Sequence, residues 1–167
     1  IADVPNTALS ALESLKDLKN IKYITVHASG GLEMLKAVTK KAKKINKSIK
    51  VLGVTILTSL DNKSVQEIGY TNKVEKLVLK QVSLIKKSGA SGVICSAHEA
   101  KIIRKKFKNF FIVTPGIRLP GDKENDQKRI TTPKQAFQNK ASAIVIGRSI
   151  TTGSPKKNIK KLIDHLN

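Results

Sequence analysis

Cysteine is nearly missing from this sequence, and so are long apolar runs. A single cysteine, Cys95, among 167 residues excludes an internal disulfide and fits a reducing cytoplasm. Cys95 lies in the apolar run Gly92-Val93-Ile94-Cys95, so we expect a small buried side chain and not a nucleophile. No stretch approaches the roughly 18 apolar residues that cross a membrane, and the first residues do not resemble a signal peptide. These absences predict a cytoplasmic protein without a membrane partner.

Acidic and aromatic residues are also scarce. The 32 lysines and arginines outnumber the 12 acidic residues, and the resulting formal charge of +20 can mark a nucleic-acid-binding protein. However, 28 of the basic residues are lysines spread over every helix-like segment, and the few aromatic residues do not alternate with them as a base-stacking surface requires. Lysines on solvated helix faces explain the charge more simply. We therefore expect no nucleic-acid partner, and nucleic-acid binding remains an alternative that rests on charge alone.

Five apolar segments of strand length recur along the chain. They are rich in Val and Ile and do not alternate with polar residues, as expected for strands buried on both faces of a parallel sheet. They cover residues 21–27, 51–58, 92–96, 110–115 and 143–147. Amphipathic helical patterns lie between them, so strand and helix alternate without a linker and predict one α/β domain over residues 1–167.

Helix starts are visible where a capping residue precedes proline or an acidic residue. Thr132-Pro133 and Ser154-Pro155 each supply an N-cap followed by proline at the first helical position. Ser64-Val65-Gln66-Glu67 reads as a capping box and predicts a short extra helix between Leu60 and Val74. Leucine and isoleucine at helical spacing predict a final amphipathic helix that contains Ile159, Leu162, Ile163 and Leu166.

The stretch from Val113 to Arg148 contains the parts of a phosphate site. Two apolar strands end in Gly116-Ile117-Arg118 and in Gly147-Arg148, and three of the four arginines fall in this stretch. Glycine frees backbone N–H groups and arginine offers a planar fork, which are the donors that phosphate needs. The polar segment between the strands, residues 119–125, is predicted to be a mobile loop that closes over the site. The alternative is an ordinary strand–loop–helix rim with solvated arginines.

The two histidines with apolar neighbours do not predict a metal centre. His27 and His98 have no second ligand at helical or turn spacing, and clusters of oxygen ligands are missing near them. We therefore expect both histidines to be structural.

Motifs in the same order and at the same spacing occur in a known family. Asp3-Val4-Pro5-Asn6-Thr7 resembles the end of the catalytic Asp-x-Lys-x-x-Asp segment of orotidine 5′-phosphate decarboxylases. The later motifs are Val26–Gly31, Leu57-Thr58-Ser59, Val93–Ala97, Thr114–Arg118, Asp126-Gln127-Lys128-Arg129 and Gly147–Ile150. Decarboxylases of keto-sugar phosphates share the barrel and the Asp-Lys motif, but the Pro-Gly-Ile-Arg and Asp-Gln-Lys-Arg segments resemble the orotidylate branch more closely.

The resemblance implies a fold and a reaction. The fold is that of the TIM (β/α)8-barrel family, here an incomplete barrel of about five parallel strands with flanking helices, whose other three strands are expected upstream of Ile1. The implied enzyme is a carboxy-lyase that converts orotidine 5′-monophosphate to uridine 5′-monophosphate in de novo pyrimidine biosynthesis, without a cofactor and as a homodimer. The family's proton-donating lysine stands three residues before Asp3, immediately upstream of Ile1. A non-catalytic remnant or split subunit that keeps phosphate binding, and a keto-sugar-phosphate decarboxylase, remain alternatives.

The resemblance also assigns roles to single residues. Asp3 is the catalytic carboxylate that reaches the partner's site, with a loop or helix-capping carboxylate as the alternative. Ser96 reads the pyrimidine amide edge, and Thr7 and Thr58 offer hydroxyls to the nucleotide, with Thr7 serving the partner's site; N-caps are the alternative for Thr7 and Ser96. The remaining substrate-binding residues are Asn6, Arg118 as support for loop and ligand, Gln127 from the closing loop, and Gly147 with Arg148 at the phosphate.

Overall fold

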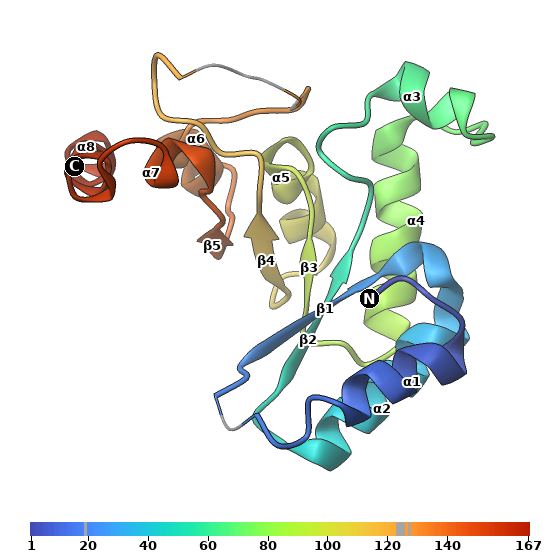
Figure 1. Cartoon of the computed structure of the whole chain (residues 1–167). Helices are drawn as coiled ribbons and strands as arrows, with labels where there is room; N and C mark the ends of the chain where they lie inside the picture. The colour runs from blue at the N-terminus through green and yellow to red at the C-terminus, as the bar shows by residue number, and fades with distance from the viewer. Residues whose placement is uncertain (19, 123–125, 127) are drawn as a thin grey trace. The chain divides into compact units, whose positions relative to one another are not determined.

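The computed structural model describes residues 1–18, 20–122, 126 and 128–167 (Figure 1). Spatial contacts divide these residues into two compact units. Unit 1 comprises Ile1–Thr55 and Leu77–Ile94, and unit 2 comprises Ile56–Lys76 and Cys95–Asn167. The single domain expected over residues 1–167 stays a prediction.

Unit 1 contains three parallel strands, which confirms the first three predicted segments. They are β1 (Tyr23–His27), β2 (Lys50–Val54) and β3 (Gly92–Ile94). Val26 pairs with Gly53 and Gly53 pairs with Val93, so the strands are in parallel register. A Cβ atom on Gly53 would collide with the Ile85 side chain, because helix α4 (Val74–Lys87) packs directly on β2.

The helices of unit 1 bury apolar side chains against one another and against the strands. They are α1 (Pro5–Glu13), the short 3-10 helix η1 (Ala28–Gly30), α2 (Gly31–Ile45) and the larger part of α4. Leu12 of α1 and Leu35 and Val38 of α2 are fully buried. Glu13 and Lys41 form an ion pair between the two helices. Burial of these leucines, at about 1.5–3 kcal/mol each, is the main term that holds α1 in place.

Unit 2 contains the other two predicted strands, each followed by a helix. Strand β4 (Phe111–Thr114) pairs in parallel with β5 (Ala143–Ile144). Cys95 lies beside β4, where its N–H bonds to the Val113 carbonyl at 3.2 Å, and its side chain is buried as predicted. The helices are α3 (Asn62–Glu67), α5 (Ala97–Lys106), α6 (Pro133–Gln138), α7 (Arg148–Thr151) and α8 (Pro155–Leu166).

The capping predictions have different outcomes. Thr132 is the N-cap of α6 with proline at the next position, as predicted, and it also forms a capping box with Gln135. The capping box at Ser64 is wrong, since the helix begins earlier and Asp61 is its N-cap. The Asp61 carboxylate accepts hydrogen bonds from the Ser64 N–H at 2.8 Å and from the Ser64 hydroxyl at 2.7 Å. The Asp61 carboxylate therefore takes the Ser64 N–H that the Glu67 side chain would bind in the predicted capping box. The short extra helix itself is confirmed as α3. Ser154 is the N-cap of α8 but makes no side-chain cap bond.

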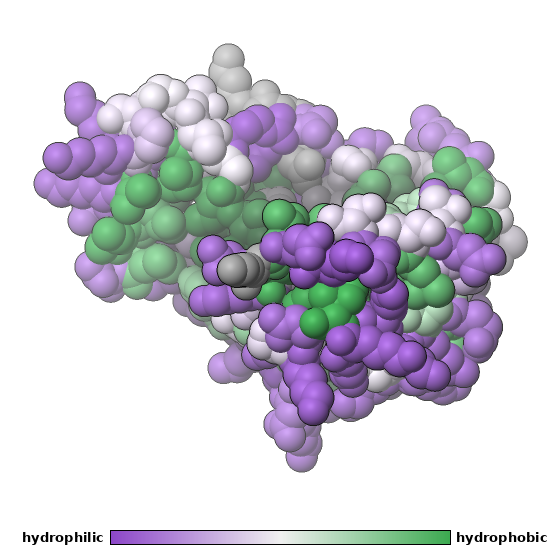
Figure 2. All heavy atoms as spheres, turned by 60° about the horizontal axis from the view of Figure 1, so that its bottom comes forward, coloured by the Kyte–Doolittle hydropathy of each residue, from purple (hydrophilic) through white to green (hydrophobic). Residues whose placement is uncertain are grey.

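Helix α8 forms as predicted, but its apolar face is not covered. Ile159 and Ile163 are 46% and 52% exposed, and Phe137 of α6 and Val145 after β5 are exposed as well. Figure 2 shows apolar side chains gathered on its left side, which holds the C-terminal elements. Within the described part of the chain, Ile159, Ile163 and Leu166 of α8 therefore lie open to solvent, whereas Leu162 is half-buried. None of the helices described is both long enough and apolar enough to cross a bilayer.

Candidate active site

The predicted substrate-contacting residues of unit 2 stand after the carboxyl ends of strands. Thr58 follows β2, Ser96 follows β3, Arg118 follows β4, and Gly147 with Arg148 follows β5. The carboxyl ends of parallel strands are where α/β proteins place their ligands. The secondary structure thus puts these residue types where the sequence expects a site.

Residues 128–131 connect three of these strand-end segments. The N–H groups of Lys128 and Arg129 donate to the Thr58 carbonyl at 3.3 and 3.2 Å. The Ser96 hydroxyl donates to the Arg129 carbonyl at 3.5 Å. The Arg118 N–H donates to the Thr131 carbonyl at 3.1 Å. The structure therefore brings Thr58, Ser96 and Arg118 together around one short segment.

Gly116 makes this close approach possible. Its φ of 74° lies in the left-handed region that favours glycine. A Cβ atom at this position would lie 3.2 Å from the Arg129 carbonyl oxygen and 3.4 Å from the Thr58 side chain. Glycine is needed here for both its backbone conformation and its lack of a side chain.

The two arginines at the strand ends differ in exposure. Arg118 is only 6% exposed and donates from Nη1 to the Ile117 carbonyl at 3.0 Å. Its expected role as support for loop and ligand stays a prediction. The Arg148 side chain is 46% exposed and pairs with the Asp126 carboxylate. Gly147 precedes it as the exposed N-cap residue of α7. The phosphate-binding roles of Gly147 and Arg148 stay predictions, and Asp126 is a partner that the sequence did not assign.

The predicted closing loop is described only in part. Leu119 and Asp122 form a turn in which the Leu119 N–H donates to the Asp122 carboxylate at 3.1 Å. Residues 123–125 and Gln127 lie outside the described residues, so the expected role of Gln127 stays a prediction.

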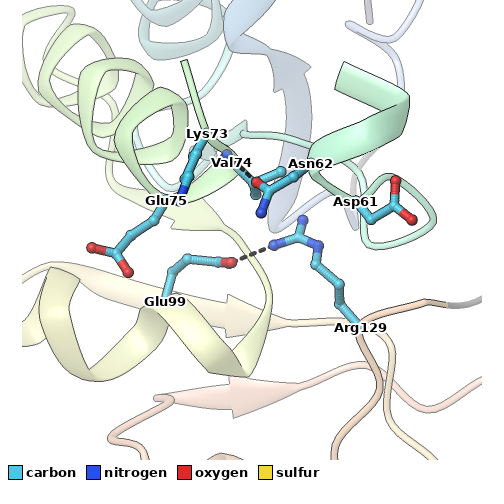
Figure 3. Close-up of a pocket in the computed structure, with 7 residues that line it drawn as sticks. All are labelled: Asp61, Asn62, Lys73, Val74, Glu75, Glu99 and Arg129. Carbon is cyan, nitrogen blue, oxygen red and sulfur yellow. Dashed lines mark hydrogen bonds and ion pairs between the residues drawn. The ribbon is translucent and has the colours of Figure 1, made fainter. Parts of the chain in front are cut away.

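Sequence reasoning missed a buried ion pair between Glu99 and Arg129 (Figure 3). The side chains are 6% and 12% exposed, and burial raises the pKa of Glu99 while the neighbouring Arg129 opposes that rise. Ser96-Ala97-His98-Glu99 has the spacing of a capping box, but this local pattern does not reveal a partner 30 residues away. Arg129 is the last residue of the Asp-Gln-Lys-Arg motif. The motif does not show which side chain Arg129 contacts, because that depends on tertiary structure.

Glu99 and Arg129 border a pocket in unit 2 with a volume of about 300 Å³ (Figure 3). Its other lining residues are Asp61, Asn62, Lys73, Val74 and Glu75. None of the described substrate-contacting candidates lines this pocket, so it lies beside the predicted site and is not that site.

Ser96 and His98 have local structural roles. The Ser96 hydroxyl accepts a hydrogen bond from the His98 N–H at 3.3 Å and caps α5, which is the alternative that the sequence left open. The His98 ring contacts the Ile130 carbonyl at 3.2 Å. No three His, Cys, Asp or Glu side chains of the described residues gather in a group that could hold a metal ion. Burial raises the pKa of the Cys95 thiol far above its usual range, as expected for a non-nucleophilic cysteine.

The remaining candidates, Asp3, Asn6 and Thr7, lie in unit 1 and are all exposed. Asp3 accepts a hydrogen bond from the Val4 N–H at 2.7 Å, just before α1. Thr7 lies inside α1, whose N-cap is Val4, so the N-cap alternative for Thr7 is wrong. Catalytic or substrate-binding roles for these residues stay predictions.

Comparison with known proteins indicates the same family as the motifs. The sequence pattern of the orotidine 5′-phosphate decarboxylase / HUMPS family matches residues 1–162. The chain belongs to this family. Among members named orotidine 5′-phosphate decarboxylase, that of Coxiella burnetii (strain RSA 331 / Henzerling II) is 39% identical over 165 residues, covering 97% of this chain and 70% of the relative. The relative from Legionella pneumophila (strain Paris) is 40% identical over 167 residues, covering 98% of this chain and 72% of its own length.

A solved structure supports the family fold. The crystal structure of orotidine 5′-phosphate decarboxylase from Lactobacillus acidophilus superposes with a TM-score of 0.81 at 34% identity. The match covers all of this chain and 72% of that protein. The predicted fold class, an incomplete (β/α)8 barrel of five parallel strands with flanking helices, is thereby confirmed.

Proposed function

We propose that this protein is a carboxy-lyase that converts orotidine 5′-monophosphate to uridine 5′-monophosphate in de novo pyrimidine biosynthesis, without a cofactor. The observation that carries the proposal is that four strand ends, those of β2 to β5, bear the residues of the family's motifs. Relatives that share 39–40% identity over nearly the whole chain carry the name of this enzyme. The same motifs favour the orotidylate branch over the keto-sugar branch of the family.

The phosphate end of the substrate is assigned to the segment after β5. Arg148 offers a guanidinium that is 46% exposed, and the exposed Gly147 offers its backbone N–H. A charge-assisted bond from a planar guanidinium fork to phosphate is roughly twice as strong as a neutral hydrogen bond. Binding energy from this remote group is available to hold the reacting ring in place.

The reacting end needs a lysine and carboxylates. Loss of CO₂ from C6 of the pyrimidine leaves a carbanion, which an ammonium held between carboxylates stabilises and then protonates. The Ile1 N–H₃⁺ donates to the Thr25 carbonyl at 2.9 Å, and the His27 N–H donates to the Ile1 carbonyl at 2.8 Å. This is the bonding pattern of a parallel strand pair. In the family pattern the lysine stands directly before Ile1 and three residues before Asp3. We infer that it would extend the segment that pairs with β1.

A homodimer and a cytoplasmic location belong to the same proposal. Asp3 and Thr7 are exposed, which leaves both side chains accessible to the site of a partner subunit. The one cysteine, Cys95, is buried as a free thiol, which suits a reducing compartment.

The test is an assay of a form that carries the Asp-x-Lys segment before Ile1, called below the lysine-containing protein. Release of CO₂ from orotidine 5′-monophosphate with formation of uridine 5′-monophosphate supports the proposal. Turnover of a keto-sugar phosphate alone would assign the protein to the other branch of the family. Binding of uridine 5′-monophosphate without turnover would identify a non-catalytic remnant.

A further inference from the structure

Arg129 binds three consecutive residues of the segment after β2. Its Nη2 donates to the Ile56 carbonyl at 3.0 Å and to the Leu57 carbonyl at 3.1 Å. Its backbone N–H donates to the Thr58 carbonyl at 3.2 Å. The side chain and the main chain of one residue thus hold the backbone that carries Thr58.

The opposite side of Arg129 meets the segment after β3. Its carbonyl accepts a hydrogen bond from the Ser96 hydroxyl at 3.5 Å, and the same hydroxyl caps α5 by accepting from the His98 N–H. Arg129 therefore lies between Thr58 and Ser96, the two residues of unit 2 that are expected to contact the nucleoside.

Glu99 determines the direction of the Arg129 guanidinium. Its carboxylate accepts from Nη1, and both side chains are almost completely buried. A guanidinium is a rigid planar fork, so fixing Nη1 at the carboxylate also directs Nη2. That direction is toward the Ile56 and Leu57 carbonyls, as the contacts show.

We propose that Arg129, oriented by Glu99, is the positioning residue that holds Thr58 and Ser96 in their substrate-binding places. The inference rests on the proposed function, because it concerns how that site is built. Arg129 itself is not assigned a contact with substrate. Its action is indirect and passes through the backbone of residues 56–58 and the Ser96 hydroxyl.

A matched control comes from Arg104 of α5, in the same unit. Its guanidinium also binds backbone carbonyls, those of Phe110 at 2.8 Å and Lys140 at 3.3 Å. These residues precede β4 and β5, so Arg104 acts at the amino ends of the strands, opposite to the candidate site. Arg104→Gln removes a structural arginine without touching the segments that Arg129 holds.

The experiment is a double-mutant cycle in the lysine-containing protein, with kcat and KM measured for orotidine 5′-monophosphate. We expect Arg129→Gln to raise KM by about tenfold or more, because Thr58 and Ser96 lose their fixed positions. In a Thr58→Val background the same substitution should raise KM further by only about threefold or less, since one of the two residues through which Arg129 acts is already lost. Arg104→Gln should leave KM within about twofold and combine additively with Thr58→Val.

Glu99→Gln gives a second route to the same answer if Arg129→Gln does not fold. The amide keeps the size of the side chain but loses the charge, so KM should rise less than in Arg129→Gln. The rise in KM caused by Glu99→Gln should again be smaller in the Thr58→Val background. Additive effects, or equal KM values for the Arg129 and Arg104 variants, would overturn the positioning role while leaving the proposed function intact. A wild-type protein that neither turns over nor binds the nucleotide would overturn both.

Discussion

The guanidinium of Arg148 donates a hydrogen bond to the carboxylate of Asp126, a residue 22 positions earlier in the chain. Both side chains are exposed, at 46% and 64%. The group expected to hold the substrate phosphate is therefore already paired with an anion of the same protein. Phosphate and carboxylate compete for the same donors, so the Asp126 carboxylate competes with the nucleotide for Arg148.

Replacing Asp126 by asparagine should strengthen nucleotide binding. An exposed ion pair contributes about 0.2–1 kcal/mol, so its removal should lower the Kd for uridine 5′-monophosphate by about 1.5- to 5-fold. Isothermal titration calorimetry of the lysine-containing protein measures this change. Asp122→Asn is the matched control, because the Asp122 carboxylate caps the Leu119 N–H and does not pair with Arg148. Weaker binding by the Asp126 variant would show that this carboxylate helps to build the site.

Arg148→Ala should weaken nucleotide binding far more than Lys105→Ala on the exposed face of α5. Loss of a charge-assisted phosphate contact costs about 1.5–3 kcal/mol, or about 10- to 150-fold in Kd, whereas an exposed lysine acts only through screened attraction. Titrations at two salt concentrations separate the two effects. Equal losses in both variants would indicate nonspecific attraction and would favour the nucleic-acid alternative.

Asp3 and Gln127 should differ in their dependence on the substrate phosphate. Gln127→Ala is expected to raise KM for the nucleotide and barely change the reaction of a nucleoside without phosphate, because that substrate never offers the contact. Asp3→Ala should slow both substrates, since it acts at the ring. Steady-state kinetics with the two substrates tests this difference. If Gln127→Ala slows both alike, the residue does not act through the phosphate.

Gly116→Ala should damage both stability and substrate binding. A left-handed alanine costs about 1–2 kcal/mol, and its Cβ would also press on the Arg129 carbonyl at 3.2 Å. Gly69→Ala is the matched control, with φ of 93° and no atom within 4 Å of the added Cβ. We expect both variants to lose stability in urea unfolding, and only Gly116→Ala to raise KM. An unchanged KM in Gly116→Ala would show that this close approach is not needed for binding.

Glu99 should make the protein less stable as the pH rises. Burial raises the pKa of Glu99 above its ordinary value of 4.5, so in the window above 4.5 the folded state holds a proton that the unfolded state has released. The stability linked to this proton is complete below pH 4.5 and is lost as the pH rises through the folded-state pKa. Glu99→Gln should remove this slope from unfolding free energies measured in urea at pH values from about 4 to about 8. Glu75→Gln, at an exposed carboxylate of the same unit, should keep the slope.

Asp61 should show the opposite sign in the same measurements. The Ser64 N–H and hydroxyl, with Lys128, hold the pKa of Asp61 well below its ordinary value of 3.8. Its stabilising effect is therefore present above pH 3.8 and is lost as the pH falls toward the folded-state pKa. Asp61→Asn should reduce the loss of unfolding free energy at acidic pH and leave the pH dependence caused by Glu99 unchanged. If the same loss of unfolding free energy at acidic pH persists in Asp61→Asn, other carboxylates cause it.

The sequence by itself determined the elements that depend on neighbours along the chain. Apolar runs predicted all five strands, helical spacing predicted the final helix α8, and Thr132-Pro133 predicted the N-cap of α6. These features are local, because a strand run or a cap needs only residues within about one turn or one strand length. The order of the motifs was also in the sequence, and it was sufficient to indicate the family.

Only the tertiary structure decided which distant groups meet. Glu99 has the spacing of a capping residue for Ser96, but its carboxylate binds Arg129, and Arg148 pairs with Asp126. The predicted cap at Ser64 failed for a different reason, since Asp61 lies one turn earlier and binds the same N–H. The apolar face of α8 was predicted, but that it stays exposed could not be read from its periodicity. Spacing along the chain predicts which face of a helix or strand a side chain occupies. The partner of that side chain depends on the segment that packs against this face in the folded protein.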